Sequence, residues 1–183
     1  MGKCLVIVDL QNDYFPGGNM ELFEIEKAAD NAKLLLSSFR KENLPVFHVQ
    51  HIAARPGATF FIPDTHGVKI NDMVAPEKNE PVIAKIFPNS FRETSLLAEL
   101  QKINADELII CGAMSHMCID STVRSAFDLG FSCVVAEDAC ATRDLIFNGK
   151  TVKAIDVHAS FMAALSAPFA KIASTDQYLK KKA

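Results

Sequence analysis

Short apolar runs alternate with longer segments of helical periodicity along most of the chain. The runs are rich in β-branched residues, whereas the longer segments repeat apolar residues at steps of three and four. This alternation is typical of a parallel sheet covered by helices, because strands buried on both faces are apolar at nearly every position. We therefore predict strands at residues 4–8, 45–49, 82–84, 108–111, 133–136 and 172–173, and helices at about 25–42, 94–103, 118–129 and 149–165.

Length and element order together predict one domain. The 183 residues suffice for one substantial core and are few for two. The predicted fold is a single-domain, three-layer α/β/α arrangement over residues 1–183, with a Rossmann-like, six-stranded, mainly parallel sheet in the order 3-2-1-4-5-6. A long loop at about 52–81 interrupts the alternation, and loops of this length in compact domains are usually functional. The end of the chain, with Lys180, Lys181 and Lys182, is expected to be a short mobile tail.

Charge and the length of the apolar segments exclude several kinds of partner. The net charge is −3 and the 19 Lys and Arg residues are scattered, so we expect no nucleic-acid partner. The apolar run near the start is too short for a signal peptide, and no stretch is long enough to span a bilayer. A cytoplasmic protein without a membrane partner is therefore expected. The five cysteines lie mostly in apolar runs, where disulfides are not expected.

Three residues suited to catalysis stand at or near the ends of predicted strands. Asp9 and Lys85 directly follow the first and third strands, and Cys118 begins the helical segment after the fourth. Open α/β sheets bind ligands at this edge, and a thiol near a helix N-terminus has a lowered pKa. Asp9 can then accept the thiol proton while Lys85 holds both charges. Each residue also has an ordinary interpretation, as a structural thiol, a turn cap and an exposed cation.

Three sequence segments carry these residues: VDLQNDYF at 8–15, Lys85 with the NSF that follows it at 89–91, and GAMSHMCID at 112–120. In this order they resemble the three signatures of the isochorismatase-like cysteine hydrolase family. The flanking pattern extends the resemblance over nearly the whole chain. One such motif alone is a weak signal, but three in the family's order are a strong one.

The resemblance implies a catalytic triad of Asp9, Lys85 and Cys118. It also implies a cis peptide bond between Ala113 and Met114, with the backbone N–H groups of Met114 and Cys118 forming an oxyanion hole. In family members with the cysteine, such as nicotinamidases and N-carbamoylsarcosine amidohydrolases, the thiolate attacks an amide-type carbon and water hydrolyses the resulting thioester. Family members are commonly oligomeric, so a homodimer or homotetramer is expected.

Cys118 favours the amidase branch of this family, because the members that cleave the vinyl ether of isochorismate lack the cysteine. The expected activity is cysteine-dependent hydrolysis of a C–N bond in a small molecule (amide, carbamoyl or ureido), without a cofactor. Two alternatives stay open. One is vinyl ether hydrolysis, which needs Asp9 but not Cys118; the other is a catalytically inactive small-molecule-binding or redox-sensing protein of the same fold. The sequence does not identify the substrate.

This chain lacks the metal-binding pattern of nicotinamidases, which hold a metal through an Asp-x-His pair and further histidines after the second strand. His48 and His51 stand at that place, with Asp64 and His66 in the long loop, but no Asp-x-His follows the strand. Residues 48 and 51 are an odd step apart and so point to opposite faces of a strand. We therefore predict no metal site, and leave open whether any of these four residues contributes to a metal or substrate site.

Aromatic side chains near the triad are the candidates for the substrate pocket, because such pockets combine apolar walls with few polar anchors. Arg55 in the long loop either anchors a substrate carboxylate or is an ordinary loop cation. His116 is expected to be a pocket wall or a structural donor, since neighbours in a tight loop rarely point at one another. The predicted pocket residues are Phe15, Phe60, Phe61, Phe91 and His116.

Overall fold

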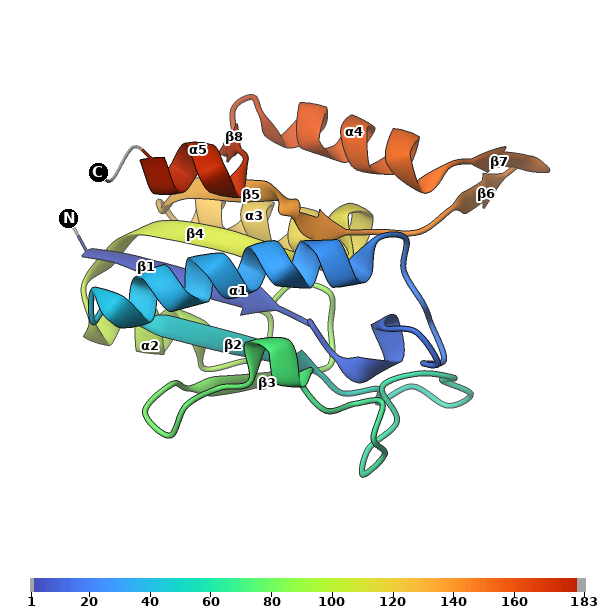
Figure 1. Ribbon diagram of the computed structural model, residues 1–183, viewed down its shortest axis with the longest axis horizontal. Coiled ribbons are helices and arrows are strands. Elements are labelled where there is room, and N and C mark those ends of the chain that lie inside the picture. Colours follow the sequence, from blue (N-terminus) through green and yellow to red (C-terminus); the bar gives the residue numbers. More distant parts are fainter. Residues whose placement is uncertain (1, 181–183) are drawn as a thin grey trace.

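Six parallel strands form the middle layer of a three-layer fold (Figure 1). The computed structural model describes residues 2–180. The strand order is β3-β2-β1-β4-β5-β8, so the predicted order is confirmed when these six strands are counted along the chain. The strands are β1 (Gly2–Val8), β2 (Val46–His51), β3 (Val82–Lys85), β4 (Ala105–Ala113), β5 (Ser132–Ala141) and β8 (Lys171–Ala173).

Helices cover both faces of this sheet, because its side chains alternate between two apolar cores. Leu5 and Ile7 of β1 face one core, and Cys4, Val6 and Val8 face the other. The first core is covered by α1 (Ile25–Lys41) and α5 (Thr175–Lys180), and the second by α2 (Leu96–Lys102), α3 (Asp120–Asp128) and α4 (Ala154–Leu165).

In the part of the chain that the structure describes, no helix has the length and apolarity needed to cross a membrane.

The pairing register brings the carboxyl ends of four strands together at one edge of the sheet. Val8 at the end of β1 pairs with Gly112 near the end of β4, and His51 at the end of β2 pairs with Lys85 at the end of β3. Asp9 follows Val8 directly, and its backbone N–H donates to the carbonyl of Val49 in β2 at 3.0 Å. This edge is where parallel α/β sheets bind their ligands.

A two-stranded hairpin replaces the first residues of the predicted helix 149–165. Its strands β6 (Leu145–Phe147) and β7 (Lys150–Val152) pair antiparallel across Asn148 and Gly149, whose φ angles are 48° and 74°. Two central residues with positive φ form the tight turn that Asn-Gly favours, and this turn outweighs the helical period. The predicted helix start at 149 is therefore wrong, and α4 begins at Ala154. The hairpin projects from the body of the molecule beside α4 (Figure 1).

The remaining differences are short elements and a shifted helix start. The predicted helix 118–129 begins earlier, as a π-helical turn η3 (Ser115–Ile119) that continues into α3. The short 3-10 helices η1 (Asn12–Tyr14) and η2 (Asp72–Val74) and the helix α5 were not predicted. Lys180 ends α5 and pairs with Asp176, whereas the rest of the predicted mobile tail lies outside the described residues.

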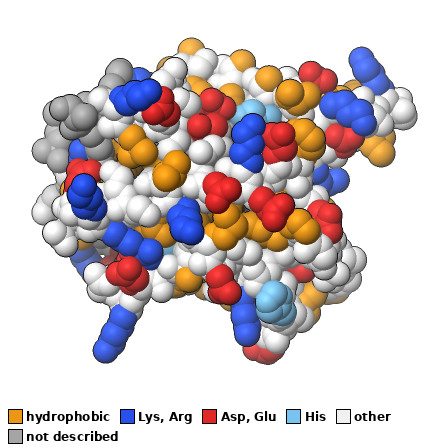
Figure 2. Space-filling model, viewed as in Figure 1, with side chains coloured by type: hydrophobic (Ala, Val, Ile, Leu, Met, Phe, Trp, Pro, Cys, Tyr) orange, Lys and Arg blue, Asp and Glu red, His pale blue; other side chains and the backbone are white. Residues whose placement is uncertain are grey.

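On the face drawn in Figure 2, Lys and Arg side chains are interspersed with Asp and Glu.

Candidate active site

The Lys85 ammonium group lies at the centre of a buried polar cluster at the carboxyl edge of the sheet. Its Nζ is 2.7 Å from Asp9 Oδ2, 3.3 Å from Cys118 Sγ and 2.9 Å from His51 Nδ1. The contact with Asp9 is an ion pair, and those with Cys118 and His51 are hydrogen bonds. Asp9, Lys85 and Cys118 are each at most 3% exposed. The structure thus brings together the three residues of the predicted triad.

The backbone around Cys118 is shaped by the junction between β4 and α3. The peptide bond between Ala113 and Met114 is cis, and the Met114 carbonyl accepts hydrogen bonds from the N–H groups of Met117 and Ile119. Cys118 lies in the π-helical turn η3, directly before α3. The sulfur therefore sits near a helix N-terminus, as the sequence predicts.

The thiol of Cys118 is nevertheless harder to ionise than an ordinary thiol. Burial is the largest influence and raises its pKa, the Asp9 carboxylate raises it further, and only Lys85 opposes them. The sequence-based expectation of a lowered pKa for Cys118 is therefore wrong for this environment, because burial and Asp9 outweigh the charge of Lys85. Burial also acts on Lys85, but Asp9 and Cys118 together raise the pKa of its ammonium group. The resting cluster is thus a neutral thiol beside an ammonium–carboxylate pair.

His51 joins this cluster as a neutral imidazole. Burial first, and then the charge of Lys85, lowers the pKa of His51 to about 4. Its Nδ1 is therefore a lone-pair acceptor for the Lys85 N–H group near neutral pH. His51 also lines the neighbouring cavity. The sequence left the role of His51 open, because strand alternation gives the direction of a side chain but not its partner.

One set of possible metal ligands falls within this cluster. Ligand atoms of Asp9, His51 and Cys118 all lie within 4.8 Å of one another, and these are ligand types that Zn²⁺ accepts. Lys85 Nζ contacts side chains of all three, however, so a cation there has to displace an ammonium ion. This arrangement fits a proton-transfer site better than a metal site.

The other three histidine and aspartate candidates do not join the cluster. His48 Nε2 is 2.9 Å from Glu80 Oε2, a carboxylate that Arg40 also binds. His66 contacts Asn12, and Asp64 lies in an exposed part of the long loop.

A cavity of about 540 Å³ opens beside Cys118 and is lined mainly by apolar side chains, several of them from the long loop. Its size is that of a small-molecule site. Of the predicted pocket residues, Phe60 and Phe61 line it. The lining also includes residues that the sequence did not indicate, among them Tyr14, Ile86, Phe87, Met117 and Arg143.

Phe15, Phe91 and His116 do not line this cavity. Phe15 is buried in the core under α1, and Phe91 stacks on Phe131 at a centroid distance of 6.0 Å. His116 Nδ1 instead contacts Thr142 Oγ1 at 2.6 Å, which ties the turn η3 to the residue that follows β5. That contact is the structural role that the sequence left as one of two options for His116.

The long loop is fastened to the segment that follows Asp9. The Asp13 carboxylate accepts hydrogen bonds from the Phe61 N–H at 2.6 Å and the Asn19 N–H at 3.1 Å. The Asp13 N–H donates to the Gly67 carbonyl, and the Ala53 N–H donates to the Phe61 carbonyl, both at 2.9 Å. Residues 54–60 thus form an excursion closed at its base, whereas residues 61–71 lie against residues 10–13.

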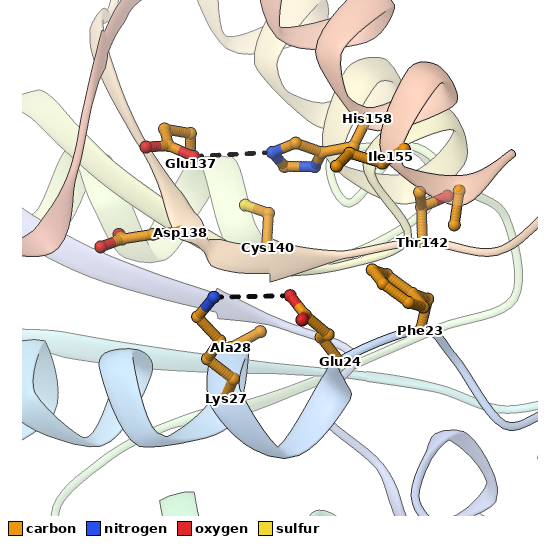
Figure 3. Close-up of a pocket in the computed structure, with 11 residues that line it drawn as sticks. Phe23, Glu24, Lys27, Ala28, Glu137, Asp138, Cys140, Thr142, Ile155 and His158 are labelled. Atoms are coloured by element: carbon orange, nitrogen blue, oxygen red, sulfur yellow. Dashed lines mark hydrogen bonds and ion pairs between the residues drawn. The ribbon is translucent and has the colours of Figure 1, made fainter.

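A second, smaller cavity lies between the start of α1, β5 and α4 (Figure 3). Its volume is about 150 Å³, and its walls include Glu137, Cys140 and His158. His158 Nε2 is 3.7 Å from Glu137 Oε2, and His158 Nδ1 contacts Ser115 Oγ at 2.9 Å. This cavity is below the usual size of a small-molecule pocket and is not lined by the Asp9, Lys85 and Cys118 cluster. The cavity that Cys118 lines is therefore the candidate active site.

Comparison with known proteins agrees with this fold. The isochorismatase domain family matches residues 3–177. The uncharacterized isochorismatase family protein YddQ of Bacillus subtilis is 52% identical over 180 residues, covering 98% of this chain and all of YddQ. A solved isochorismatase-type structure from Oleispira antarctica superposes with a TM-score of 0.95 at 46% identity, covering 98% of this chain and 96% of the other.

The chain therefore belongs to the isochorismatase family of hydrolases. Among its relatives with a named activity, the streptothricin hydrolase of Streptomyces noursei is 32% identical over 175 residues. That match covers 96% of this chain and 60% of the streptothricin hydrolase.

Proposed function

We propose that this protein hydrolyses a C–N bond of a small amide, carbamoyl or ureido compound through a thioester on Cys118. The observation that carries the proposal is the contact of Cys118 Sγ with Lys85 Nζ at 3.3 Å, beside the Asp9 carboxylate and at the wall of a cavity. A nucleophile with a base and an orienting charge is the usual construction of a covalent catalyst.

In the first half-reaction, Asp9 accepts the proton of the Cys118 thiol as the sulfur adds to the substrate carbonyl carbon. The backbone N–H groups of Met114 and Cys118 bind the oxyanion of the tetrahedral intermediate. Asp9 then returns its proton to the leaving nitrogen, and the C–N bond breaks to leave a thioester. Lys85 stays protonated throughout and stabilises both the thiolate and the carboxylate.

The second half-reaction uses the same groups with water. Asp9 takes a proton from water as the water oxygen adds to the thioester carbon, and the C–S bond breaks to release the acid. The proton returns from Asp9 to the sulfur, which restores the resting cluster. His51 accepts a hydrogen bond from Lys85 and so keeps the ammonium group aimed at Asp9 and Cys118. Every step needs only side-chain and backbone groups of this chain and water, so no cofactor is part of the proposal.

Ammonia or amine release from a panel of small amides tests the proposal in the wild type, Cys118→Ala and Asp9→Asn. Both substitutions are expected to lower kcat by about a thousandfold or more, because members of one catalytic unit are rarely dispensable. Cys133→Ala is the matched control, since Cys133 is a buried thiol in β5 outside the site. Mass spectrometry of the intact protein during turnover should detect the acyl group on Cys118.

Two results would replace this proposal. Full activity of Cys118→Ala together with loss of activity in Asp9→Asn indicates acid–base cleavage, as expected of vinyl ether hydrolysis. Reversible oxidation of Cys118 without turnover of any amide indicates a binding or redox-sensing protein.

A further inference from the structure

Ser115, the first residue of the turn η3, joins the segment that carries Cys118 to two other elements. Its side chain is buried, and Oγ lies 2.9 Å from His158 Nδ1 in α4 and 3.3 Å from the carbonyl oxygen of Ala141 at the end of β5. Ala141 pairs in turn with Ala113, the last residue of β4. One hydroxyl group therefore fixes the start of η3 against both a strand and a helix.

The hydrogen-bonding capacity of these groups indicates which of them donates. A serine hydroxyl has one hydrogen to donate and can also accept, whereas a backbone carbonyl only accepts. Both contacts of Ser115 are satisfied when its hydroxyl donates to Ala141 and His158 Nδ1 donates to the hydroxyl. The other ring nitrogen of His158 faces Glu137 at 3.7 Å, which is beyond hydrogen-bonding distance (Figure 3). Ser115 is thus the hydrogen-bonding partner that orients this imidazole.

The side chains of η3 divide into anchors and cavity walls. Ser115 is one anchor, and His116 is the other through its 2.6 Å contact with Thr142 Oγ1. Met117 and Cys118 instead line the active-site cavity. The position of the reacting sulfur and of the neighbouring backbone N–H groups therefore depends on contacts made by the two residues that begin the turn.

We infer that Ser115 and His158 are positioning residues for the backbone N–H groups of Met114 and Cys118, which bind the oxyanion in the proposed mechanism. Met114 directly precedes Ser115, and its carbonyl accepts two N–H groups of the turn, so the anchor and both donors form one unit. Donors of this kind act where charge develops, and a misplacement of about 1 Å costs about a hundredfold in rate. The inference rests on the proposed function, because it assigns a role within that mechanism.

Two reagents that modify the same sulfur test this role without knowledge of the natural substrate. p-Nitrophenyl acetate acylates the Cys118 thiolate, so that a C–S bond forms through an oxyanion intermediate and p-nitrophenolate leaves. Iodoacetamide alkylates the thiolate by direct displacement of iodide, and no oxyanion forms. The ratio of the two rates at Cys118 therefore reports on the oxyanion hole, while effects on ionisation of the thiol cancel.

Both rates are measured by peptide mass spectrometry at one pH, with 2-mercaptoethanol as the reference thiol. The acylation-to-alkylation ratio of wild-type Cys118 is expected to exceed that of the reference by about a hundredfold. His158→Ala and Ser115→Ala should each lower the ratio about tenfold, which corresponds to one lost hydrogen bond. Their alkylation rates should stay within about twofold of the wild type, because displacement of iodide does not use the oxyanion hole.

Two further variants of His158 separate positioning from simple filling of space. The amide of His158→Asn can donate from about the place of Nδ1 and should keep most of the wild-type ratio. The longer side chain of His158→Gln places its amide near Nε2, so this variant should resemble His158→Ala. A role that depends only on volume predicts the opposite order, since Gln is closer to His in size. His48→Ala is the matched control, because it removes a buried imidazole bonded to Glu80 and should leave the ratio unchanged.

The outcomes distinguish failure of this inference from failure of the proposed function. A raised wild-type ratio that is unchanged in His158→Ala and Ser115→Ala overturns the positioning role alone, as does a ratio kept better by His158→Gln than by His158→Asn. A wild-type ratio no higher than that of 2-mercaptoethanol overturns the inference together with the oxyanion hole of the proposed mechanism. If an alanine variant unfolds, which alkylation of the four other buried cysteines reveals, the comparison of His158→Asn with His158→Gln decides.

Discussion

Replacing Lys85 by Met is expected to destabilise the fold by about 3–5 kcal/mol, the range for removing one partner of a buried ion pair. The Lys85 and Asp9 side chains are fully buried, with Nζ and Oδ2 2.7 Å apart. Met fills a similar volume without the charge, so the loss arises from leaving the Asp9 carboxylate without its counter-ion. The double variant Asp9→Asn/Lys85→Met removes both charges and should recover at least about half of this loss, because uncharged replacements of a buried pair are often nearly neutral.

Urea unfolding followed by far-UV circular dichroism measures the four members of this double-mutant cycle. The coupling energy between the two positions is expected to be about 3 kcal/mol, near the upper end for interacting residues. Lys102→Met is the control, since the Lys102–Glu99 pair is at the surface and should change stability by less than ~1 kcal/mol. A loss below ~1 kcal/mol in Lys85→Met, or a double variant no more stable than the single one, would refute the buried ion pair.

Two further predictions concern pH and assembly. Stability is expected to fall from about pH 6.5 towards pH 4, because the folded state lowers the pKa of His51 to about 4 while the unfolded chain keeps it near 6.5 and so binds more protons in this interval. His51→Asn should flatten that slope in urea midpoints, and an unchanged slope contradicts the buried neutral imidazole. For assembly, we expect a homodimer or homotetramer in which the hairpin side chains Ile146 and Phe147, 76% and 74% exposed in the single chain, become covered. The variant Ile146→Ser/Phe147→Ser should then sediment as a smaller species than the wild type, whereas a monomeric wild type contradicts the expectation.

The sheet was predictable because its signal is repeated along the chain. Six apolar runs, separated by helical segments except at the long loop, indicate a parallel sheet, and the right-handed crossover rule leaves few possible strand orders. Strand ends also indicate the site, since Asp9 and Lys85 each terminate an apolar run and so emerge at the same edge. These features depend on local pattern and on general topology, which the sequence carries directly.

The walls of the cavity were not predictable in the same way. Phe87 and Phe91 both follow Lys85 in a stretch without periodicity, yet only Phe87 lines the cavity while Phe91 packs on Phe131. Arg143 lies beyond the predicted end of the fifth strand at residue 136, and only the extension of β5 to Ala141 carries it to the site. The pKa of Cys118 depends on burial, which no motif reports.

Hydrogen bonds fix one part of the long loop against the segment that follows Asp9 and leave another part, which lines the cavity, free of such bonds. Residues 61–71 cannot change length without disturbing residues 10–13 and hence Asp9, because hydrogen bonds join the two segments along their course. Residues 54–60 carry no such constraint, since the Ala53–Phe61 hydrogen bond closes their base whatever the number of residues between. Insertions or deletions in this short excursion would deepen or shorten the cavity while leaving the reacting groups in register. It is therefore the segment to exchange when a hydrolase with a different substrate is to be built on this scaffold.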